Sequence, residues 1–252
     1  MRLYWIFVTL LISFSTLASQ DAKRLLISHD KTIYNPLVYA IKNISFTVEI
    51  DGLAKEISSL KSYGTISKIS FDIKVNKLKK YDIKVVGIPK GFKELANNLR
   101  SKLIPYLELL FPQSLNNFYR SYDLKVKNSK VTAIDPTYLK SIRESYLLFD
   151  KSGVLIENKI KTPQGTQIIN FDHVRAKGGL QELLLSKVGR KIIYGPSHLL
   201  SNTRITYNLD GEKPVPVKIV TEFTFENKEN NSSGNRVNKL NERYTIRNFK
   251  IN

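Results

Sequence analysis

Cysteine is absent from this 252-residue sequence, and tryptophan is nearly absent. Without cysteine, the chain has no disulfide to close its loops and no thiol to which a lipid could be attached. The single tryptophan, Trp5, lies near the start of the chain, so the rest has no Trp for the aromatic girdle of a membrane-embedded β-barrel. These absences exclude a disulfide-stabilised domain and a thiol-anchored lipoprotein.

Patterns of catalytic residues are also missing. His29, His173 and His198 are far apart in the sequence, and no G-x-S-x-G nucleophile motif accompanies them. No His and carboxylate cluster has metal-ligand spacing, no Walker or dinucleotide-binding glycine pattern occurs, and no carboxylate pair stands out for acid–base chemistry. We therefore expect no enzymatic activity, no metal and no cofactor, with His173 on a polar strand face and His198 in a solvated loop.

Acidic residues are few, since 22 Asp and Glu face 40 Lys and Arg and leave a formal net charge of +18. A basic surface could contact nucleic acid, anionic lipid headgroups or lipopolysaccharide phosphates, and export favours the last two. Lys outnumbers Arg, and Ile and Asn are abundant, as AT-rich codon usage would produce. Composition and solubility are therefore the simpler explanation of the charge, and no nucleic-acid partner is expected.

A secretory signal peptide is predicted for residues 1–18. Arg2 precedes an apolar run from Leu3 to Ile12, and small and polar residues then lead to a cleavage position after Ala18. The apolar run is too short to span about 30 Å of hydrocarbon. We expect an exported, periplasmic protein of residues 19–252 with a net charge of +17, because cleavage removes only one charged residue.

One strongly helical pattern runs from Val85 to Pro112. Its apolar residues recur at helical spacing and are Phe92, Leu95, Leu99, Leu103, Tyr106 and Leu110. Because Pro105 lacks an amide hydrogen and disfavours helical angles at the residue before it, we expect a break there. A lone helix among strands must lie on a sheet, where residues of about 90–111 either close the core or cover a ligand cavity as a lid.

Elsewhere apolar and polar residues alternate with period two, which predicts half-buried strands. The clearest apolar sets are Ile44, Phe46, Val48 and Ile50, and then Ile69, Phe71, Ile73 and Val75. Further strands are expected along most of the chain, among them Leu180–Val188 and Ile205–Leu209, with a weaker strand between Leu53 and Tyr63. Leu37–Ile41 is expected to form one or two helical turns, and residues of about 226–242 a mobile polar loop.

Tight turns make consecutive strands antiparallel neighbours, and about ten or eleven of them cannot stay flat. We therefore predict a single mainly β (α+β) domain, namely a curved, incompletely closed antiparallel β-barrel with an inserted amphipathic helical lid. Lys77, Lys79 and Lys80 surround a turn between two of its strands. They either discourage edge-to-edge aggregation or contact an anionic membrane surface or acidic partner.

The order of these parts resembles the periplasmic outer-membrane lipoprotein carrier (LolA-like) family. The similar parts are the signal peptide, a short N-terminal helix, a few strands, an inserted amphipathic helix and a long meander with the reversals F-D-K-S-G-V-L from Phe149 and K-T-P-Q-G-T-Q from Lys161. The resemblance implies a barrel that holds acyl chains beneath helices. The family's best-known member latches its lid through an Arg on an early strand, whereas this chain has no Arg between Arg24 and Arg100.

We therefore expect a monomeric, non-catalytic periplasmic carrier or binder of lipoproteins, lipids or other apolar ligands. Its pocket is predicted to combine the concave sheet face with the apolar stripe of the helix, and its residues are Phe46, Val48, Ile69, Phe71, Ile73, Phe92, Leu95, Leu99, Leu103 and Tyr106. Two alternatives are an integral outer-membrane β-barrel and a structural surface protein without a cavity.

Overall fold

The computed structural model describes residues 19–60, 64–176, 181–195, 197–227 and 238–252. The expected signal peptide, residues 1–18, lies outside these ranges, as does the centre of the loop expected at 226–242. The two ends of that loop instead belong to strands β11 (Lys213–Asn227) and β12 (Asn238–Ile251), because their backbones continue the antiparallel pairing.

Twelve antiparallel strands form one continuous sheet in the order β3-β2-β1-β12-β11-β10-β9-β8-β7-β6-β5-β4. The other strands are β1 (Asn43–Ile50), β2 (Ser70–Asn76), β3 (Tyr81–Val86), β4 (Asp123–Lys127), β5 (Lys130–Ile134), β6 (Glu144–Phe149), β7 (Leu155–Thr162), β8 (Gly165–Arg175), β9 (Leu183–Tyr194) and β10 (Ser197–Asp210). The mainly β prediction is confirmed, whereas the expected count of about ten or eleven strands is too low. The sheet is open, with β3 and β4 at its edges.

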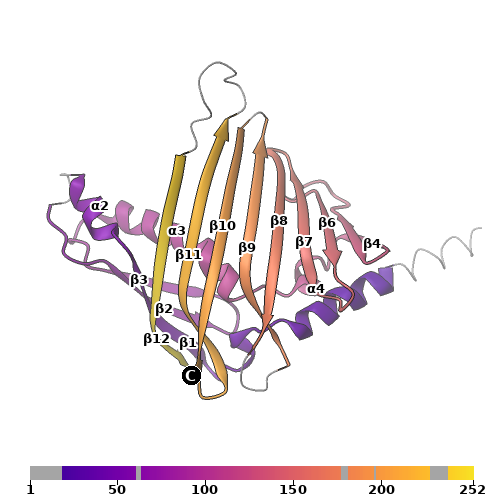
Figure 1. The fold of residues 1–252 in the computed structure, drawn as a ribbon, viewed down its shortest axis with the longest axis horizontal. Coiled ribbons are helices and arrows are strands. Elements are labelled where there is room, and N and C mark those ends of the chain that lie inside the picture. The colour runs from indigo at the N-terminus through magenta and orange to yellow at the C-terminus, as the bar shows by residue number, and fades with distance from the viewer. Residues whose placement is uncertain (1–18, 61–63, 177–180, 196, 228–237) are drawn as a thin grey trace, which may run out of the picture.

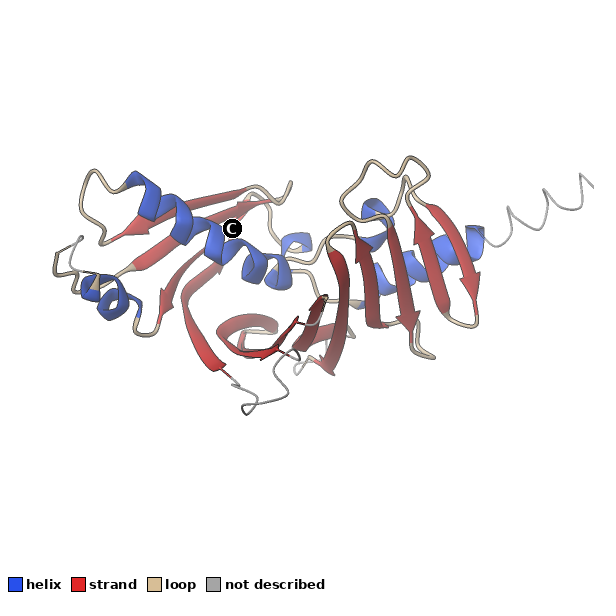
Figure 2. Ribbon diagram, turned by 90° about the horizontal axis from the view of Figure 1, so that it is seen from above, coloured by secondary structure: helices blue, strands red, loops and turns tan. Residues whose placement is uncertain are grey.

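The helices lie on one side of this curved sheet, which we call the inner face. Figure 2 shows α3 across one end of the sheet and the N-terminal helix, described over residues 19–32, along the other, with the sheet bending between them. The helical segments after the N-terminal helix are η1 (Pro36–Val38), α2 (Leu53–Ser59), α3 (Lys93–Leu110) and α4 (Leu115–Phe118). The part of the inner face between the two long helices belongs to the middle strands, β8 to β11 (Figure 1).

The alternation predicted for the early strands is confirmed. Ile44, Phe46 and Val48 of β1 are at most 3% exposed, and the residues between them are half-buried. Phe46 pairs with Ile73 on β2, so one buried face continues across both strands. Since side chains of a strand alternate between its two faces, the apolar set faces the core and the polar set faces outward.

Two separate apolar cores lie beneath the two long helices. In the first, which we call the α3 core, α3 packs on β1, β2 and β12, and its largest buried side chains include Phe71, Leu103, Phe111 and Tyr244. In the second, the N-terminal core, Ala22 and Leu26 of the N-terminal helix pack with side chains of α4 and β4 to β7; the latter include Tyr119, Leu124, Val131 and Leu147. One sheet therefore carries two hydrophobic clusters at its opposite ends.

The break expected at Pro105 is wrong, because α3 is one helix from Lys93 to Leu110. A proline inside a helix costs about 3 kcal/mol. Leu103, Tyr106 and Leu107 on either side of it are at most 8% exposed, and burying each such side chain contributes about 1.5 to 3 kcal/mol. Packing of the helix on the sheet therefore outweighs the local preference of Pro105.

The weak strand expected between Leu53 and Tyr63 is also wrong, since Leu53–Ser59 form the helix α2. Leu53 and Ile57 are both buried, and their spacing of four places them on the same side of a helix. The turn before α2 is provided by Gly52, whose φ of 77° suits glycine. The expected helical turns at Leu37–Ile41 correspond to the short helix η1, which Asn35 caps through its side chain.

Candidate functional site

Most residues of the expected pocket lie in the α3 core, where the helix packs directly on the sheet. Seven of the ten are at most 6% exposed and belong to this cluster, namely Phe46, Val48, Ile69, Phe71, Ile73, Leu99 and Leu103. Phe92 and Leu95, at the start of α3, are half-buried. One side of α3, from Leu99 onward, therefore closes a core, which was the simpler of the two interpretations of the helical pattern.

A cavity of about 260 Å³ lies beneath the second half of α3, and we call it the inner cavity. Of the ten expected residues it includes Tyr106 alone. The full lining is Lys102, Pro105, Tyr106 and Leu109 from α3, Val188 and Arg190 from β9, Ser201 and Thr203 from β10, Thr221 and Phe223 from β11, and Glu242 from β12. Since one helix and four strands supply the walls, only the assembled sheet creates this space.

Glu242 is the centre of a polar cluster on one wall of the inner cavity. Its carboxylate forms a 2.7 Å ion pair with Lys102 and accepts hydrogen bonds from the hydroxyls of Tyr106 and Tyr244. Although burial opposes the charge, these three donors hold the pKa of Glu242 below its usual value. Burial raises the pKa of Tyr106 to about 12, so this hydroxyl stays protonated and donates. The carboxylate and its partners are thus mutually satisfied.

Arg190 lies on β9, whereas Glu242 lies on β12, and both line the inner cavity. The side chain of Arg190 is half-buried. Burial lowers the pKa of its guanidinium, and Glu108 partly opposes that effect. No hydrogen bond or ion pair reaches the guanidinium from any residue that the structure describes. The cavity wall therefore offers a positive charge with five unused N–H donors.

The strand register places a band of apolar side chains directly beyond the inner cavity. On the same face, Phe223 and Leu240 lie in the cross-strand row of Arg190 and Ser201, and the next row carries Ile192, Leu199 and Phe225. We call these five side chains the apolar strip. Phe225 is 49% exposed and Leu240 is 54% exposed. Figure 1 shows that β10 and β11 extend beyond α3 toward the ends that carry this strip. None of the described helices covers the side chains of Phe225 and Leu240, and a large exposed apolar surface usually marks an interaction site.

The basic turn between β2 and β3 is only partly as expected. Lys77 and Lys80 are exposed, as is Leu78 at 77%. Lys79 is instead half-buried, and burial lowers the pKa of its ammonium group despite the nearby Glu108 carboxylate. The side chain of Asn76 accepts hydrogen bonds from the backbone of residues 78 and 80 and fixes the turn. Two of the three lysines are therefore free to meet an external partner.

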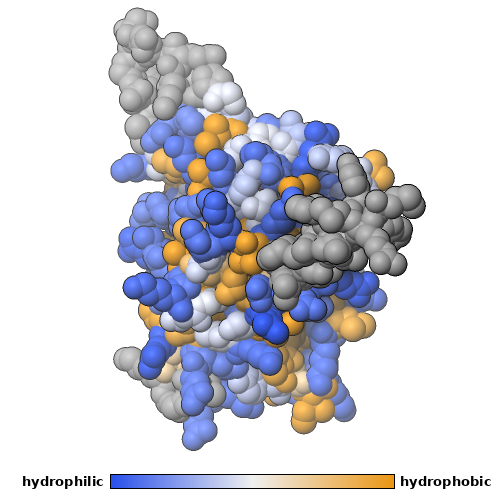
Figure 3. All heavy atoms as spheres, turned by 90° about the vertical axis from the view of Figure 1, so that its right-hand side faces the viewer, coloured by the Kyte–Doolittle hydropathy of each residue, from blue (hydrophilic) through white to orange (hydrophobic). Residues whose placement is uncertain are grey.

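The opposite edge of the sheet is basic as well. A shallow groove along β4 includes Lys125, Lys127 and Lys130, together with Lys23 and Arg120. Figure 3 shows this end of the molecule, where hydrophilic side chains predominate and hydrophobic ones are interspersed. Lysines on an edge strand oppose pairing with another sheet. Both edges of the open sheet thus have the composition that limits aggregation.

Two histidines that are far apart in the sequence lie together at the N-terminal helix. The rings of His29 and His173 have centroids 6.3 Å apart. The Nδ1 atom of His29 accepts a hydrogen bond from the backbone N–H of Leu155, at 3.1 Å. Burial lowers the pKa of His29 to about 4, and His173 lowers it further while Asp30 and Asp150 oppose the effect. The separation of 144 positions gave no indication of this contact.

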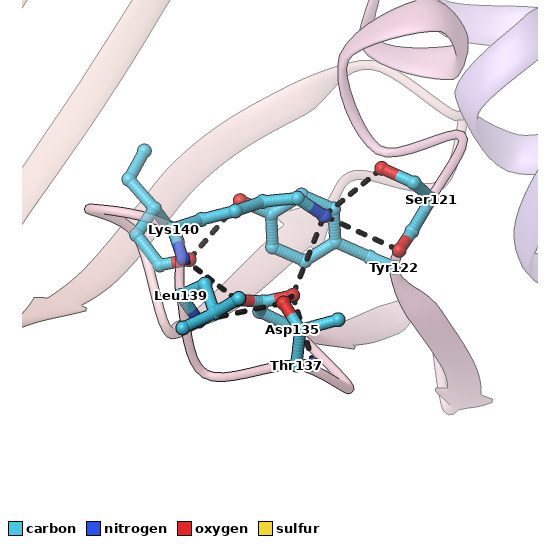
Figure 4. A network of polar contacts seen from close by, with 7 residues as sticks. Ser121, Tyr122, Asp135, Thr137, Leu139 and Lys140 are labelled. Carbon is cyan, nitrogen blue, oxygen red and sulfur yellow. Dashed lines mark hydrogen bonds and ion pairs between the residues drawn. The ribbon is translucent and has the colours of Figure 1, made fainter.

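Asp135 is the most completely satisfied carboxylate near the N-terminal core (Figure 4). Its side chain is fully buried, accepts hydrogen bonds from the backbone and hydroxyl of Thr137 and from the backbone of Lys140, and forms a 3.4 Å ion pair with Lys140. The ammonium group of Lys140 also bonds to Ser121 and lies 4.0 Å from the ring centre of Tyr122. Despite burial, these bonds lower the pKa of Asp135 to about 2, which suits a structural tie rather than proton transfer.

Neither metal binding nor a helical membrane span is supported by the described residues. Within them, no three His, Asp or Glu side chains are grouped so that they could hold a metal ion. No helix in the described ranges is both long enough and apolar enough to cross a membrane.

The chain matches no protein-family model, no curated protein and no solved structure. The resemblance to lipoprotein carriers therefore stays a prediction, and the site has to be interpreted from its own geometry.

Proposed function

We propose that this protein is a non-catalytic carrier or binder of lipids, lipidated proteins or other apolar ligands, which lie on the inner face of β9 to β12. The observation that supports this function most is the apolar strip, which continues from the inner cavity and is not covered by α3. The proposal moves the ligand away from Phe46 and Phe71, which the sequence favoured, because those side chains are already buried in the α3 core.

The chemistry of the strip suits a hydrocarbon chain. Phe223 and Phe225 provide flat apolar surfaces, while Ile192, Leu199 and Leu240 lie on the neighbouring strands. Burial of an acyl chain contributes about 0.8 kcal/mol per methylene. Such contacts do not require a particular side-chain geometry, so the strip can accept chains of different identity.

Export to the periplasm and action as a monomer complete the proposal. Both follow from the predicted signal peptide and from the resemblance to carriers, and the exposed Lys77 and Lys80 support a transient contact with anionic membrane. A structural surface protein without a ligand is the competing function, and it makes no use of an exposed apolar strip.

Native mass spectrometry of residues 19–252 tests the proposed function. After incubation with an acylated peptide, we expect a complex with the unmutated protein and at least about tenfold weaker binding by the double variant Phe225→Gln/Leu240→Gln, because two large apolar contacts are lost. Leu139→Gln is the matched control, since Leu139 is 88% exposed on the loop between β5 and β6. A mass without peptide for the unmutated protein, even at high peptide concentration, would overturn the function.

A further inference from the structure

Arg190 occupies the boundary between the inner cavity and the apolar strip. On β9 it is paired with Ile169 on β8 and with Ser201 on β10, so it lies in the middle of the inner face. The next inward-facing position along β9 is Ile192 of the apolar strip, and the preceding one is the buried Val188. A charged group therefore lies between apolar neighbours along β9, beside the hydroxyl-bearing Ser201 of β10.

The charges around the inner cavity do not balance. Glu242 is the acidic side chain of the lining, and Lys102 already pairs with it at 2.7 Å. The carboxylate of Glu242 also accepts hydrogen bonds from two tyrosine hydroxyls, so its acceptor capacity is largely used. Arg190 is the remaining charged side chain of the lining, and Glu108, which attracts it from outside the lining, forms no ion pair or hydrogen bond with it in the part of the chain that the structure describes. A half-buried charge without a partner is unfavourable, which indicates that an acceptor from outside the chain completes the site.

We propose that Arg190 binds the acidic head group of an amphiphile, a carboxylate or a phosphate, whose hydrocarbon chain lies along the apolar strip. This inference rests on the proposed function and specifies its ligand class. The planar guanidinium can donate two parallel hydrogen bonds to a carboxylate or a phosphate. The hydroxyl-bearing Ser201 and Thr203 line the cavity beside it and add polar surface for the same head group.

The size of the inner cavity supports this division of the ligand. Its volume of about 260 Å³ is below the roughly 300 to 1,000 Å³ of sites that enclose a whole small molecule. A head group fits inside, whereas an acyl chain must leave the cavity. Phe223 lines the cavity, and Phe225 follows it on the same face of β11. The apolar strip therefore continues from the cavity and offers a surface on which the acyl chain can lie. A free inorganic anion would leave that strip without a function.

The test compares ligands that share one hydrocarbon chain, namely laurate, dodecyl phosphate and dodecanol, with inorganic phosphate as the probe without a chain. Binding is measured by calorimetry at pH 8, where both acidic head groups are ionised. The variant Arg190→Gln removes the charge, and Arg204→Gln is the matched control because Arg204 is exposed on the outer face of β10. Arg190→Lys keeps the charge but loses the bidentate geometry.

We expect the unmutated protein to bind laurate or dodecyl phosphate on the order of tenfold to a hundredfold more tightly than dodecanol. Arg190→Gln should abolish this preference and leave dodecanol binding unchanged, Arg190→Lys should keep part of it, and Arg204→Gln should keep all of it. If Arg190→Gln fails to fold, the inference is tested by two other measurements. These are the preference of the unmutated protein for the acidic ligands over dodecanol, and the reduction of that preference in Arg190→Lys.

Two other outcomes separate this inference from the proposed function. Equal binding of all three chain-bearing ligands, unaffected by Arg190→Gln, would overturn the role of Arg190 and leave the carrier function in place. Binding of none of them would overturn both. Inorganic phosphate bound as tightly as dodecyl phosphate would show an anion site that does not use the strip, which would also overturn the inference.

Discussion

The α3 core and the N-terminal core each place a helix on the inner face of the same sheet, but they hold that helix by different interactions. Along α3, Leu99, Leu103 and Leu107 are all at most 6% exposed. Along the described part of the N-terminal helix, Ala22 and Leu26 are the fully buried apolar side chains. The N-terminal helix therefore gains less from apolar burial and needs other contacts.

Polar contacts hold the N-terminal helix in addition to its smaller apolar burial. The carboxylate of Asp30 accepts hydrogen bonds from the hydroxyl of Ser114 and the backbone of Leu115 and Asn116, which caps α4. His29 accepts a hydrogen bond from the backbone of β7. Apolar burial is insensitive to pH and tolerant of small displacements, whereas such bonds depend on protonation and on direction. The stability of the α3 core should therefore depend less on pH than the stability of the N-terminal core.

The largest effect is expected from truncation in the α3 core. Leu103→Ala should lower the free energy of unfolding by about 2 to 5 kcal/mol, because Leu103 is 1% exposed and its loss leaves a cavity. Urea denaturation measures this change. Leu95→Ala is the control within the same helix. Because Leu95 is half-buried, its truncation should lower the free energy of unfolding by less.

The same experiment separates a core helix from a movable lid. If Leu103→Ala left stability unchanged, α3 would not be held by burial, and the comparison between the two cores would fail. Leu99→Lys extends the test, because a charge placed at a side chain that is 6% exposed should lower the melting temperature strongly.

An intermediate effect is expected when the pH is lowered. The pKa of His29 falls from 6.5 in the unfolded chain to about 4 in the folded protein. Its contribution to stability is complete above pH 6.5 and is lost as the pH falls toward 4, with a limit of about 3 kcal/mol. His173, whose pKa burial also lowers, acts in the same direction.

This pH window distinguishes the two cores. In the α3 core region, the stabilising ionisation of Glu242 is present above pH 4.5 and is lost only below it. Between pH 6.5 and 4.5, hydrogen exchange corrected for its intrinsic rate should therefore quicken in the N-terminal helix and stay slow in α3. His29→Gln should reduce the pH dependence in the N-terminal helix to the part that His173 contributes, with His198→Gln on β10 as the control. Equal quickening in both helices would contradict the comparison.

The parts of the fold that were predictable from sequence are strands with one solvent-exposed face and one buried face. In β1 and β2 this difference imposes strict alternation, and the register follows from it. The predicted strand Leu180–Val188 overlaps β9 (Leu183–Tyr194) only from Leu183 to Val188, with Leu180 outside the described residues, and Ile205–Leu209 is only a part of β10 (Ser197–Asp210). The missing portions contain Arg190 and Ser201, which put polar groups on the inner face. The local pattern is weakest where the candidate site lies.

The candidate site itself could not be predicted from the sequence. Arg190, Thr221 and Glu242 come from different strands and meet only through the register of the assembled sheet. The sequence predicts Glu242 at the end of a mobile polar loop, because the residues before it are mostly polar and Val237 and Leu240 are too few to give a strand pattern. Pro105 led to the wrong prediction of a helix break. The free-energy cost of a proline inside a helix is real, but it is smaller than the stabilisation from the buried side chains on both sides of Pro105.

The smallest effect concerns the two edges of the sheet. Lys77→Gln/Lys80→Gln should weaken association with anionic vesicles by about 1 kcal/mol per lysine, and added salt should have the same effect because it screens charges within roughly 8 Å. The matched control is Lys125→Gln/Lys127→Gln on β4, which removes equal charge from the other edge. Vesicle sedimentation measures both. Equal loss from the two edges would show a non-specific attraction, and undetectable binding of the unmutated protein at low salt would remove the docking role.

The pairing of β1 with β12 also dictates the order in which this chain can acquire its structure. Strands β4 to β12 are consecutive neighbours in the sheet, so each can pair with the strand before it as soon as it has been synthesised. β1 can pair with β2 early, but its other neighbour is β12 at the far end of the chain, because Ile44 pairs with Ile251. The side chains of β1, β2 and α3 can therefore pack on one another early, but the part of their core that Tyr244 and Ile246 of β12 cover stays exposed until nearly the last residue appears.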